Sequence, residues 1–422
     1  VQPFISATTT ATLDFSLTSA ITSTISDTPM PINNPTVFPT SIPGVIQHCL
    51  KISDVIRLSD IGLQGTIALM GIYPQSIPGS YLLDLSSGET KAFPTQGMSY
   101  MVNGAVSPDR NWFAYEGAGE DLTSGRQLVI VDSQGVVQKT INLSNIKTPA
   151  SYMVLAEWLE NNHMVFTWGE ERDTAPIYAS TIFVDPFTEE STEYQSNYPN
   201  LYYLYPNYLY IWSNYGPTLS VYNTSVDRVL FLSFDGVVLW NLTTQQQIRI
   251  FEDIPENNLT NPVWSPDGQH FIMDQNTASG RNLFLVTKNG VTQQITFFNG
   301  RNGFGTNMGD FTDYVWSPDG KSIAFWLMTG IGERAGEASY DLAILDLISG
   351  EIHNYCIDKF IWRSIEPVWS PDGKWLVVPV PNGFSPGSDS LQRAKTILID
   401  INKNQAYPIA EDAVPLGWMV ND

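Results

Sequence analysis

Apolar and polar positions alternate in short runs along most of the chain, and the runs recur at a fixed interval. The letters VWSPDG at Val263–Gly268 return at Val315–Gly320 and Val368–Gly373, 52 and 53 residues apart. An apolar run follows each copy. This pattern predicts a β-meander: the tryptophan ends one strand, Ser-Pro-Asp-Gly forms the turn, and the apolar run is the next strand. Because a meander of this size cannot bury its own apolar face, we expect the repeats to stack.

Two series of strand ends extend the repeat over the chain. The first series contains the residues before the sharp turns: Val106, Trp158, Tyr222, Trp264, Trp316 and Trp369. The second contains the polar ends of apolar strands: Asp84, Asp132, Asp185, Asn241, Thr287, Asp346 and Asp400. The member that the first series lacks is supplied by the C-terminal strand Ala413–Trp418. We expect this strand to pair with Gly65–Ile72 and to close a ring of seven four-stranded blades, which leaves only short sheet edges.

The WSPDG core followed by a strand with an aspartate near its end resembles the repeat of the TolB-type propeller family. The resemblance covers about Gly62 to Trp418. It implies an all-β propeller and a binding role for a glycan, a peptide or an envelope protein at the mouth of the channel. The α/β domain at the N-terminus of that family has no counterpart in this sequence. We therefore assign residues 49–422 to a seven-bladed propeller and residues 1–48 to an N-terminal arm and linker.

The arm has two parts and contains no Lys or Arg. Phe4–Ser26 has no proline, and its apolar residues fall on odd positions, as expected for an extended β-strand. These apolar residues are Leu13, Phe15, Leu17, Ile21 and Ile25. Five prolines between Pro29 and Pro43 then predict a stiff connector that cannot join a sheet interior. At about 3.1 Å per residue this connector extends roughly 45 Å.

A strand held away from its own domain on a spacer is suited to β-augmentation of a neighbouring molecule. Applied head to tail, this addition of the arm to the next copy produces an open filament or lattice. Two other interpretations stay open: the arm packs on its own propeller, or it is a flexible or glycosylated stalk.

The composition of the chain limits the classes of binding partner and the cellular locations that we expect. The net charge of −22 and the pI near 4.4 argue against nucleic acid or an anionic membrane surface as the main partner. No apolar run is long enough to span a bilayer, so we expect no transmembrane segment. The chain begins at Val1 and continues with Ser/Thr-rich sequence, which we interpret as a secreted or surface-displayed protein whose signal peptide has been removed. Cys49 and Cys356 form either a disulfide or two buried thiols, and the sequence leaves both states open.

The sequence contains motifs that resemble catalytic ones, but they do not form a catalytic site. The hydrolase-like pattern GFSPG at Gly383–Gly387 lies in a loop and has no histidine after it. His163 and His270 fall in non-adjacent blades, so a shared metal ion is not expected, and no motif indicates a cofactor. From the sequence we therefore expect no enzymatic activity.

One insertion is a candidate binding surface. Tyr194–Tyr215 is rich in tyrosine, whose rigid apolar body and polar tip suit protein interfaces and sugar stacking. The candidate contact residues are Tyr202, Tyr203, Tyr205, Tyr208 and Trp212. The other interpretation is an ordinary strand with a packed loop. Glycosylation sequons occur at Asn142, Asn223, Asn241 and Asn258.

The sequence thus predicts a structural or adhesive subunit without a catalytic centre, which assembles with copies of itself through the arm. The alternative is a TolB-like binding module for a glycan, a peptide or another surface protein.

Overall fold

The computed structural model describes most of the chain beyond residue 44. The described residues are 45–53, 57–72, 79–94, 100–118, 126–147, 153–159, 163–170, 177–195, 219–222, 228–233, 236–241, 244, 246–252, 262–277, 280–298, 311–331, 338–359, 366–384 and 392–420. The apolar residues of the arm and the five candidate residues of the tyrosine-rich insertion lie outside these ranges. No helix in the described residues is long and apolar enough to cross a membrane.

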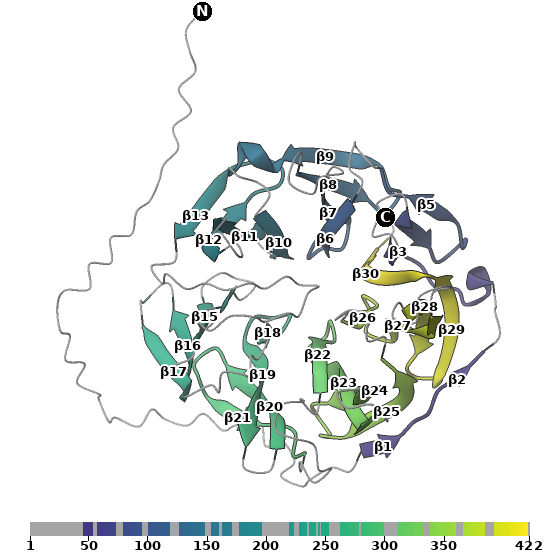
Figure 1. Ribbon diagram of the computed structural model, residues 1–422. Helices are drawn as coiled ribbons and strands as arrows, with labels where there is room; N and C mark the ends of the chain where they lie inside the picture. Colours follow the sequence, from purple (N-terminus) through teal and green to yellow (C-terminus); the bar gives the residue numbers. More distant parts are fainter. Residues whose placement is uncertain are drawn as a thin grey trace, which may run out of the picture.

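The described strands form seven sheets that lie side by side around a ring (Figure 1). Within each sheet the propeller strands pair antiparallel with their neighbours in the chain or, in one sheet, with the C-terminal strand. The all-β propeller fold predicted from the sequence is confirmed. We name each sheet by its strands, from the inner strand near the centre of the ring to the outer strand at its rim.

The first four sheets in chain order are as follows. One sheet contains β30 (Ala413–Met419), β3 (Thr66–Gly71), β4 (Tyr81–Asp84) and β5 (Thr90–Ala92). The next contains β6 (Tyr100–Val106), β7 (Trp112–Ala118), β8 (Gln127–Asp132) and β9 (Val137–Asn142). It is followed by β10 (Met153–Trp158), β11 (Met164–Glu170), β12 (Ile177–Val184) and β13 (Ser191–Gln195). The fourth contains β14 (Leu219–Tyr222), β15 (Arg228–Ser233), β16 (Gly236–Asn241) and β17 (Gln247–Glu252).

Three sheets complete the ring. The first contains β18 (Val263–Trp264), β19 (His270–Thr277), β20 (Gly280–Thr287) and β21 (Thr292–Gln294). The second contains β22 (Phe311–Trp316), β23 (Ser322–Ile331), β24 (Ala338–Asp346) and β25 (Ile352–Asp358), with β1 (Val45–Gln47) outside β25. The third contains β26 (Val368–Trp369), β27 (Trp375–Phe384), β28 (Gln392–Asp400) and β29 (Gln405–Glu411), with β2 (Lys51–Ile52) outside β29. Two short 3-10 helices are described, η1 (Leu58–Asp60) and η3 (Leu143–Asn145).

The Ser-Pro-Asp-Gly turns connect the inner strand of a sheet to its second strand, as predicted. In the turn after β22, the Ser317 hydroxyl donates to Asp319 Oδ1 at 2.7 Å, and the Gly320 N–H donates to the Ser317 carbonyl at 2.9 Å. Gly320 has φ +68°, a left-handed conformation that glycine adopts without steric cost. The same serine–aspartate bond recurs in three other turns, at Ser107–Asp109, Ser265–Asp267 and Ser370–Asp372. The repeat is therefore a repeated turn with its own hydrogen bonds.

The end of the chain pairs with its beginning. Strand β30 is antiparallel to β3, with Ala413 opposite Gly71 and Met419 opposite Thr66. This confirms the predicted pairing of Ala413–Trp418 with Gly65–Ile72. The C-terminal strand is the inner strand of a sheet whose other three strands come from the N-terminal side of the propeller. Hydrogen bonds between β30 and β3 therefore join the two ends of the ring.

The hydrophobic core lies between neighbouring sheets. One cluster combines Ala114 and Leu128 of sheet β6–β9 with Trp158 and Phe166 of sheet β10–β13. Another combines Trp326 of sheet β22–β25 with Trp369 of sheet β26–β29. Each sheet therefore buries its apolar faces only when its neighbours are in place, as stacked repeats require.

The buried carboxylates of two ion pairs also connect neighbouring sheets. Glu116 on β7 pairs with Arg126, and Glu116 Oε2 accepts a hydrogen bond from the Leu155 N–H of β10 at 2.9 Å. Asp274 on β19 pairs with Arg281 and accepts a hydrogen bond from the Tyr314 hydroxyl of β22 at 3.1 Å. Burial raises the pKa of Glu116, although the adjacent Arg126 charge lowers it in part. These bonds supply the partners that a buried carboxylate needs.

Candidate interaction site at the strapped rim

Residues 45–53 form a strap across the rim of two neighbouring sheets. Strand β1 pairs in parallel with β25, and β2 pairs in parallel with β29 (Figure 1). The backbone hydrogen bonds that flank Cys49 run from His48 N to Asn354 O at 2.7 Å, from Leu50 N to Tyr355 O at 3.1 Å and from Ser53 N to Ala406 O at 2.9 Å. The strap therefore extends two sheets by one short strand each. Strand β1 lies within residues 1–48, the range that the sequence assigns to the arm and linker.

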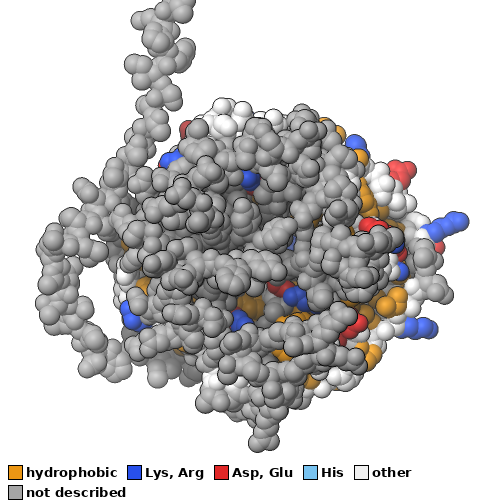
Figure 2. Space-filling view, in the orientation of Figure 1, with side chains coloured by type: hydrophobic (Ala, Val, Ile, Leu, Met, Phe, Trp, Pro, Cys, Tyr) orange, Lys and Arg blue, Asp and Glu red, His pale blue; other side chains and the backbone are white. Residues whose placement is uncertain are grey.

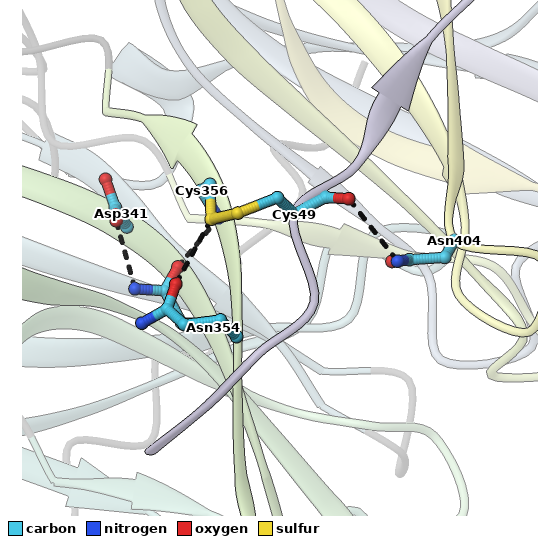
Figure 3. The surroundings of a disulfide bond; sticks show 6 residues. Cys49, Asp341, Asn354, Cys356 and Asn404 are labelled. Carbon is cyan, nitrogen blue, oxygen red and sulfur yellow. Dashed lines mark hydrogen bonds between the residues drawn. A yellow bond between two sulfur atoms is a disulfide. The ribbon is translucent and has the colours of Figure 1, made fainter.

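A disulfide fixes the middle of the strap. Cys49 is bonded to Cys356 of β25, with a Cα–Cα distance of 4.8 Å (Figure 3). On the other side of the strap, Asn404 Nδ2 donates to the Cys49 carbonyl oxygen at 3.4 Å. Of the two states that the sequence left open for the cysteines, the structure shows the disulfide. Cys49 thus contacts both strapped sheets, one through a covalent bond and the other through a side-chain hydrogen bond.

Two histidines meet beside this disulfide. The rings of His48 and His353 are edge to face, with centroids 4.6 Å apart. The Glu351 carboxylate lies 3.6 Å from His353 Nε2, and the Tyr355 ring lies 6.5 Å from His48. The sequence predicts no contact between His48 and His353, and the two histidines compared there are His163 and His270. The link depends on the parallel pairing of β1 with β25, for which the local sequence gives no signal.

The strap shows that the rim of this propeller accepts added strands. Outside the two strapped sheets, the outer strands are β5, β9, β13, β17 and β21, and no further strand pairs with them in the part of the chain that the structure describes. An outer strand presents backbone N–H and C=O groups that a further strand can use. The rim is therefore a candidate interaction site for strand addition.

A second candidate site lies at the end of the sheets opposite the Ser-Pro-Asp-Gly turns. Asp313 of β22 pairs with Lys359, and both side chains are about one-tenth exposed. The ammonium of Lys359 lies 5.2 Å from the centroid of the Tyr340 ring, a cation–π distance. Asp313 has φ +49° beside a bulge in the pairing of β22 with β23. Basic and acidic side chains are visible together near the middle of the ring in Figure 2.

Glu366 adds a second carboxyl group to this site. Burial, followed by the nearby Asp313 carboxylate, raises the pKa of Glu366 to about 7. The Glu366 side chain is surrounded by many protein atoms, but part of its surface is exposed to water. A carboxyl group with this pKa can hold or release a proton near neutral pH. Asp313 and Glu366 each lie three residues before the tryptophan that ends an inner strand, a repeat position that could have identified the pair from the sequence.

The tyrosine-rich insertion lies between two described strands in the sequence. In the sequence it follows the outer strand β13 and precedes the inner strand β14. Tyr202, Tyr203, Tyr205, Tyr208 and Trp212 themselves lie outside the described residues, as do Leu13, Phe15, Leu17, Ile21 and Ile25 of the arm. Their assignments stay predictions. His163 and His270 begin or precede second strands of two different, non-adjacent sheets, as expected.

Comparison with known proteins gives distant relatives. No protein-family model matches the chain. The Bacillus subtilis (strain 168) protein named uncharacterized peptidase YuxL is 27% identical over 153 residues, and the match spans 29% of this chain and only 22% of that relative.

Similar solved structures include TolB from Acinetobacter baumannii, at 15% identity and a TM-score of 0.42, with 84% of this chain and 66% of that chain covered. Another is oligogalacturonate lyase from Vibrio parahaemolyticus, at 12% identity and a TM-score of 0.45, with 83% and 87% covered. A candidate 6-phosphogluconolactonase from Bacteroides fragilis has 11% identity and a TM-score of 0.48, with 85% and 98% covered. TolB is thus among the structures that this chain is similar to, in agreement with the resemblance in sequence.

These comparisons correct one prediction. The sequence predicts no enzymatic activity, because it contains no recognisable nucleophile motif or metal site. Part of the chain is nevertheless similar to a protein named a peptidase. The absence of a recognisable motif therefore does not exclude enzymatic activity.

Proposed function

We propose that the chain is an extracellular interaction module, a seven-bladed propeller that assembles with copies of itself through its N-terminal arm. The observation that carries this proposal is the strap. Strands β1 and β2 add in parallel to the outer strands of two sheets, so strand addition at the rim already occurs within the chain. The arm enters the structure at this rim, directly before Val45. Its alternating apolar residues suit the same kind of pairing with a neighbouring molecule.

Covalent attachment of the strap supports this role. A pull on the arm acts first on β1, which has only three residues. The Cys49–Cys356 disulfide follows two residues later and transfers the load to β25. A subunit that is held to its neighbour by a donated strand needs such an attachment, because three paired residues alone are a weak anchor. The disulfide also suits the oxidising extracellular location that we propose.

The test compares the intact chain with a chain that lacks residues 1–28, by light scattering and negative-stain imaging. We expect filaments or large oligomers of the intact chain and monomers of the shortened chain. A third chain carries serine at Leu13, Phe15 and Leu17 and should also be monomeric. A matched control carries asparagine at Ser16 and Thr18, which keeps the apolar row, and should assemble. Monomers of the intact chain at all concentrations would refute self-assembly.

The second candidate function is binding of a glycan, a peptide or an envelope protein at the end of the sheets that carries Asp313, Lys359 and Glu366. The observation that favours it is the convergence of two carboxyl groups, an ammonium group and the Tyr340 ring. A ligand that binds only the folded state raises the thermal unfolding temperature. We expect such a shift to disappear when Tyr202, Tyr203, Tyr205 and Tyr208 are replaced by alanine.

A further inference from the structure

The outer strand β17 differs from the other outer strands that carry no added strand. On β17, Ile248 and Ile250 lie on one face and are half-buried, whereas Arg249 between them is exposed. The two isoleucines pack closely on the next sheet, since a Cβ atom built at Gly290 would lie 3.0 Å from a carbon atom of each. Phe251 continues the apolar surface through an edge-to-face contact with Phe284 at 5.5 Å. The outer strand of this sheet therefore has apolar residues on one face and Arg249 on the other.

The other four outer strands are less suitable. Strands β5 and β21 have only three residues each. Strand β9 has Lys139 between Val137 and Ile141 in its inward-facing row, and Lys139 is paired with Glu189. Strand β13 has the polar sequence STEYQ. Among the strands that the structure describes at the unstrapped rim, β17 alone combines six residues with two successive apolar residues, Ile248 and Ile250, in one row.

We propose that β17 of one copy accepts residues 13–17 of a second copy as an added outer strand. This inference rests on the self-assembly proposed above and names its acceptor. In a strand, Leu13, Phe15 and Leu17 lie on one face and Asp14 lies on the other. The apolar residues extend the row of Ile248 and Ile250, and Asp14 then lies on the same face as Arg249.

The charge of the arm and the length of the connector agree with this pairing. The arm contains no Lys or Arg, so its aspartates have no basic neighbours within the arm. An opposite-charge pair across adjacent strands contributes modestly to stability and helps to fix the register. The connector between the donor segment and β1 extends roughly 45 Å when it is in the polyproline conformation. This length allows the donor segment to leave the rim at β25 and to reach a neighbouring propeller. Addition to β17 also enlarges an existing apolar cluster, which contains Leu230, Trp264 and Phe271 with Ile250 and Phe251 at its margin.

A charge exchange tests the register. Arg249→Asp and Asp14→Lys each place two like charges next to each other in the proposed strand pair. The chain that carries both changes restores a pair of opposite charges. We expect each single variant to raise the concentration at which half of the subunits are assembled by about threefold to tenfold. The double variant should return to within about twofold of the unchanged chain. Thr140→Asp, on the exposed face of β9, is the matched control and should leave assembly unchanged. Thermal unfolding of each variant shows whether the propeller itself is intact.

Cross-linking tests the contact directly. Copies with Asp14→Cys are mixed with copies with Arg249→Cys and then oxidised, with Thr140→Cys as the control acceptor. We expect a covalent dimer on a non-reducing gel only for the first mixture. A cross-link that forms within a single chain carrying both changes, at a monomeric mass, would overturn the proposal in favour of an arm packed on its own propeller.

Failure of this inference is distinguishable from failure of self-assembly. If the intact chain polymerises and the chain without residues 1–28 does not, but neither charge exchange nor cross-linking involves Arg249, the arm binds elsewhere and only β17 is refuted. If the intact chain is monomeric, both proposals are refuted.

Discussion

Acidic side chains, which give the chain its net charge of −22, have several distinct structural roles. At the ends of third strands, Asp84 and Asp346 accept hydrogen bonds at 2.8 Å from the backbone N–H groups two and three residues later. Glu116 and Asp274 instead lie buried between sheets, each ten residues after the end of an inner strand. These four acidic side chains therefore belong to the construction of the repeat. Glu366 has neither role, and its raised pKa makes it responsive to pH.

We expect Glu366 to make the propeller less stable above neutral pH. Its pKa is raised from 4.5 to about 7 by the fold. The stabilising effect of the protonated carboxyl group is complete below pH 4.5 and is lost as the pH rises through 7. Glu366→Gln cannot ionise and should remove this loss. Thermal unfolding between pH 4.5 and 8.5 should show the variant and the unchanged chain converging near pH 4.5, separating as the pH rises to 7, and staying apart by a constant amount above it. Parallel curves would show that Glu366 does not titrate in this range.

At the scale of strands, the sequence predicts what local chemistry determines. The inner strands β10, β18 and β26 end at Trp158, Trp264 and Trp369, as predicted, because the turn residues that follow impose the reversal. The third strands β8 and β24 end at Asp132 and Asp346, since these aspartates cap the next turn. The strap was not predictable, because parallel pairing of β1 with β25 joins residues about 307 positions apart and needs only three residues. The contact between His48 and His353 was not predictable for the same reason, because the two residues are far apart in the sequence.

We expect the disulfide to be the main anchor of the strap. Cys356→Ser leaves only the short pairings of β1 and β2, so the strap should detach readily. The loss should cost about 2–4 kcal/mol of unfolding free energy, as for other disulfides that close long loops. Urea unfolding followed by tryptophan fluorescence gives this value. The chain with both Cys49→Ser and Cys356→Ser should have the same unfolding free energy as the single variant. A much lower unfolding free energy of the single variant would indicate a side reaction of the remaining thiol.

At the scale of the whole molecule, closure of the ring depends on close packing of β30 against its neighbours. Gly417 of β30 faces Val106 at the end of β6, and a Cβ atom at Gly417 would lie 2.1 Å from Val106 Cγ2. The closing strand thus needs glycine at this point, where it also approaches the next sheet. The sequence predicted the pairing of β30 with β3 from the count of repeats. It could not predict this contact, which depends on how two sheets stack.

Gly417→Ala should therefore destabilise the ring by about 1–3 kcal/mol, the usual cost of overpacking. Val106→Ala in the same chain removes the clashing methyl groups and should restore part of the loss. Differential scanning calorimetry of the two single variants and the double variant measures the coupling. Simple additivity of the two single effects would show that the side chains do not clash.

The disulfide of the strap also changes what a protease can achieve. Residues 50–355 lie between its two cysteines, and four complete sheets, from β6 to β21, belong to that span. A peptide bond cut anywhere in this span separates the chain into pieces that are still one covalent molecule. The fragments come apart only after reduction. The propeller can thus be nicked in a long connection and remain attached, through Cys49 and the strap, to the same arm.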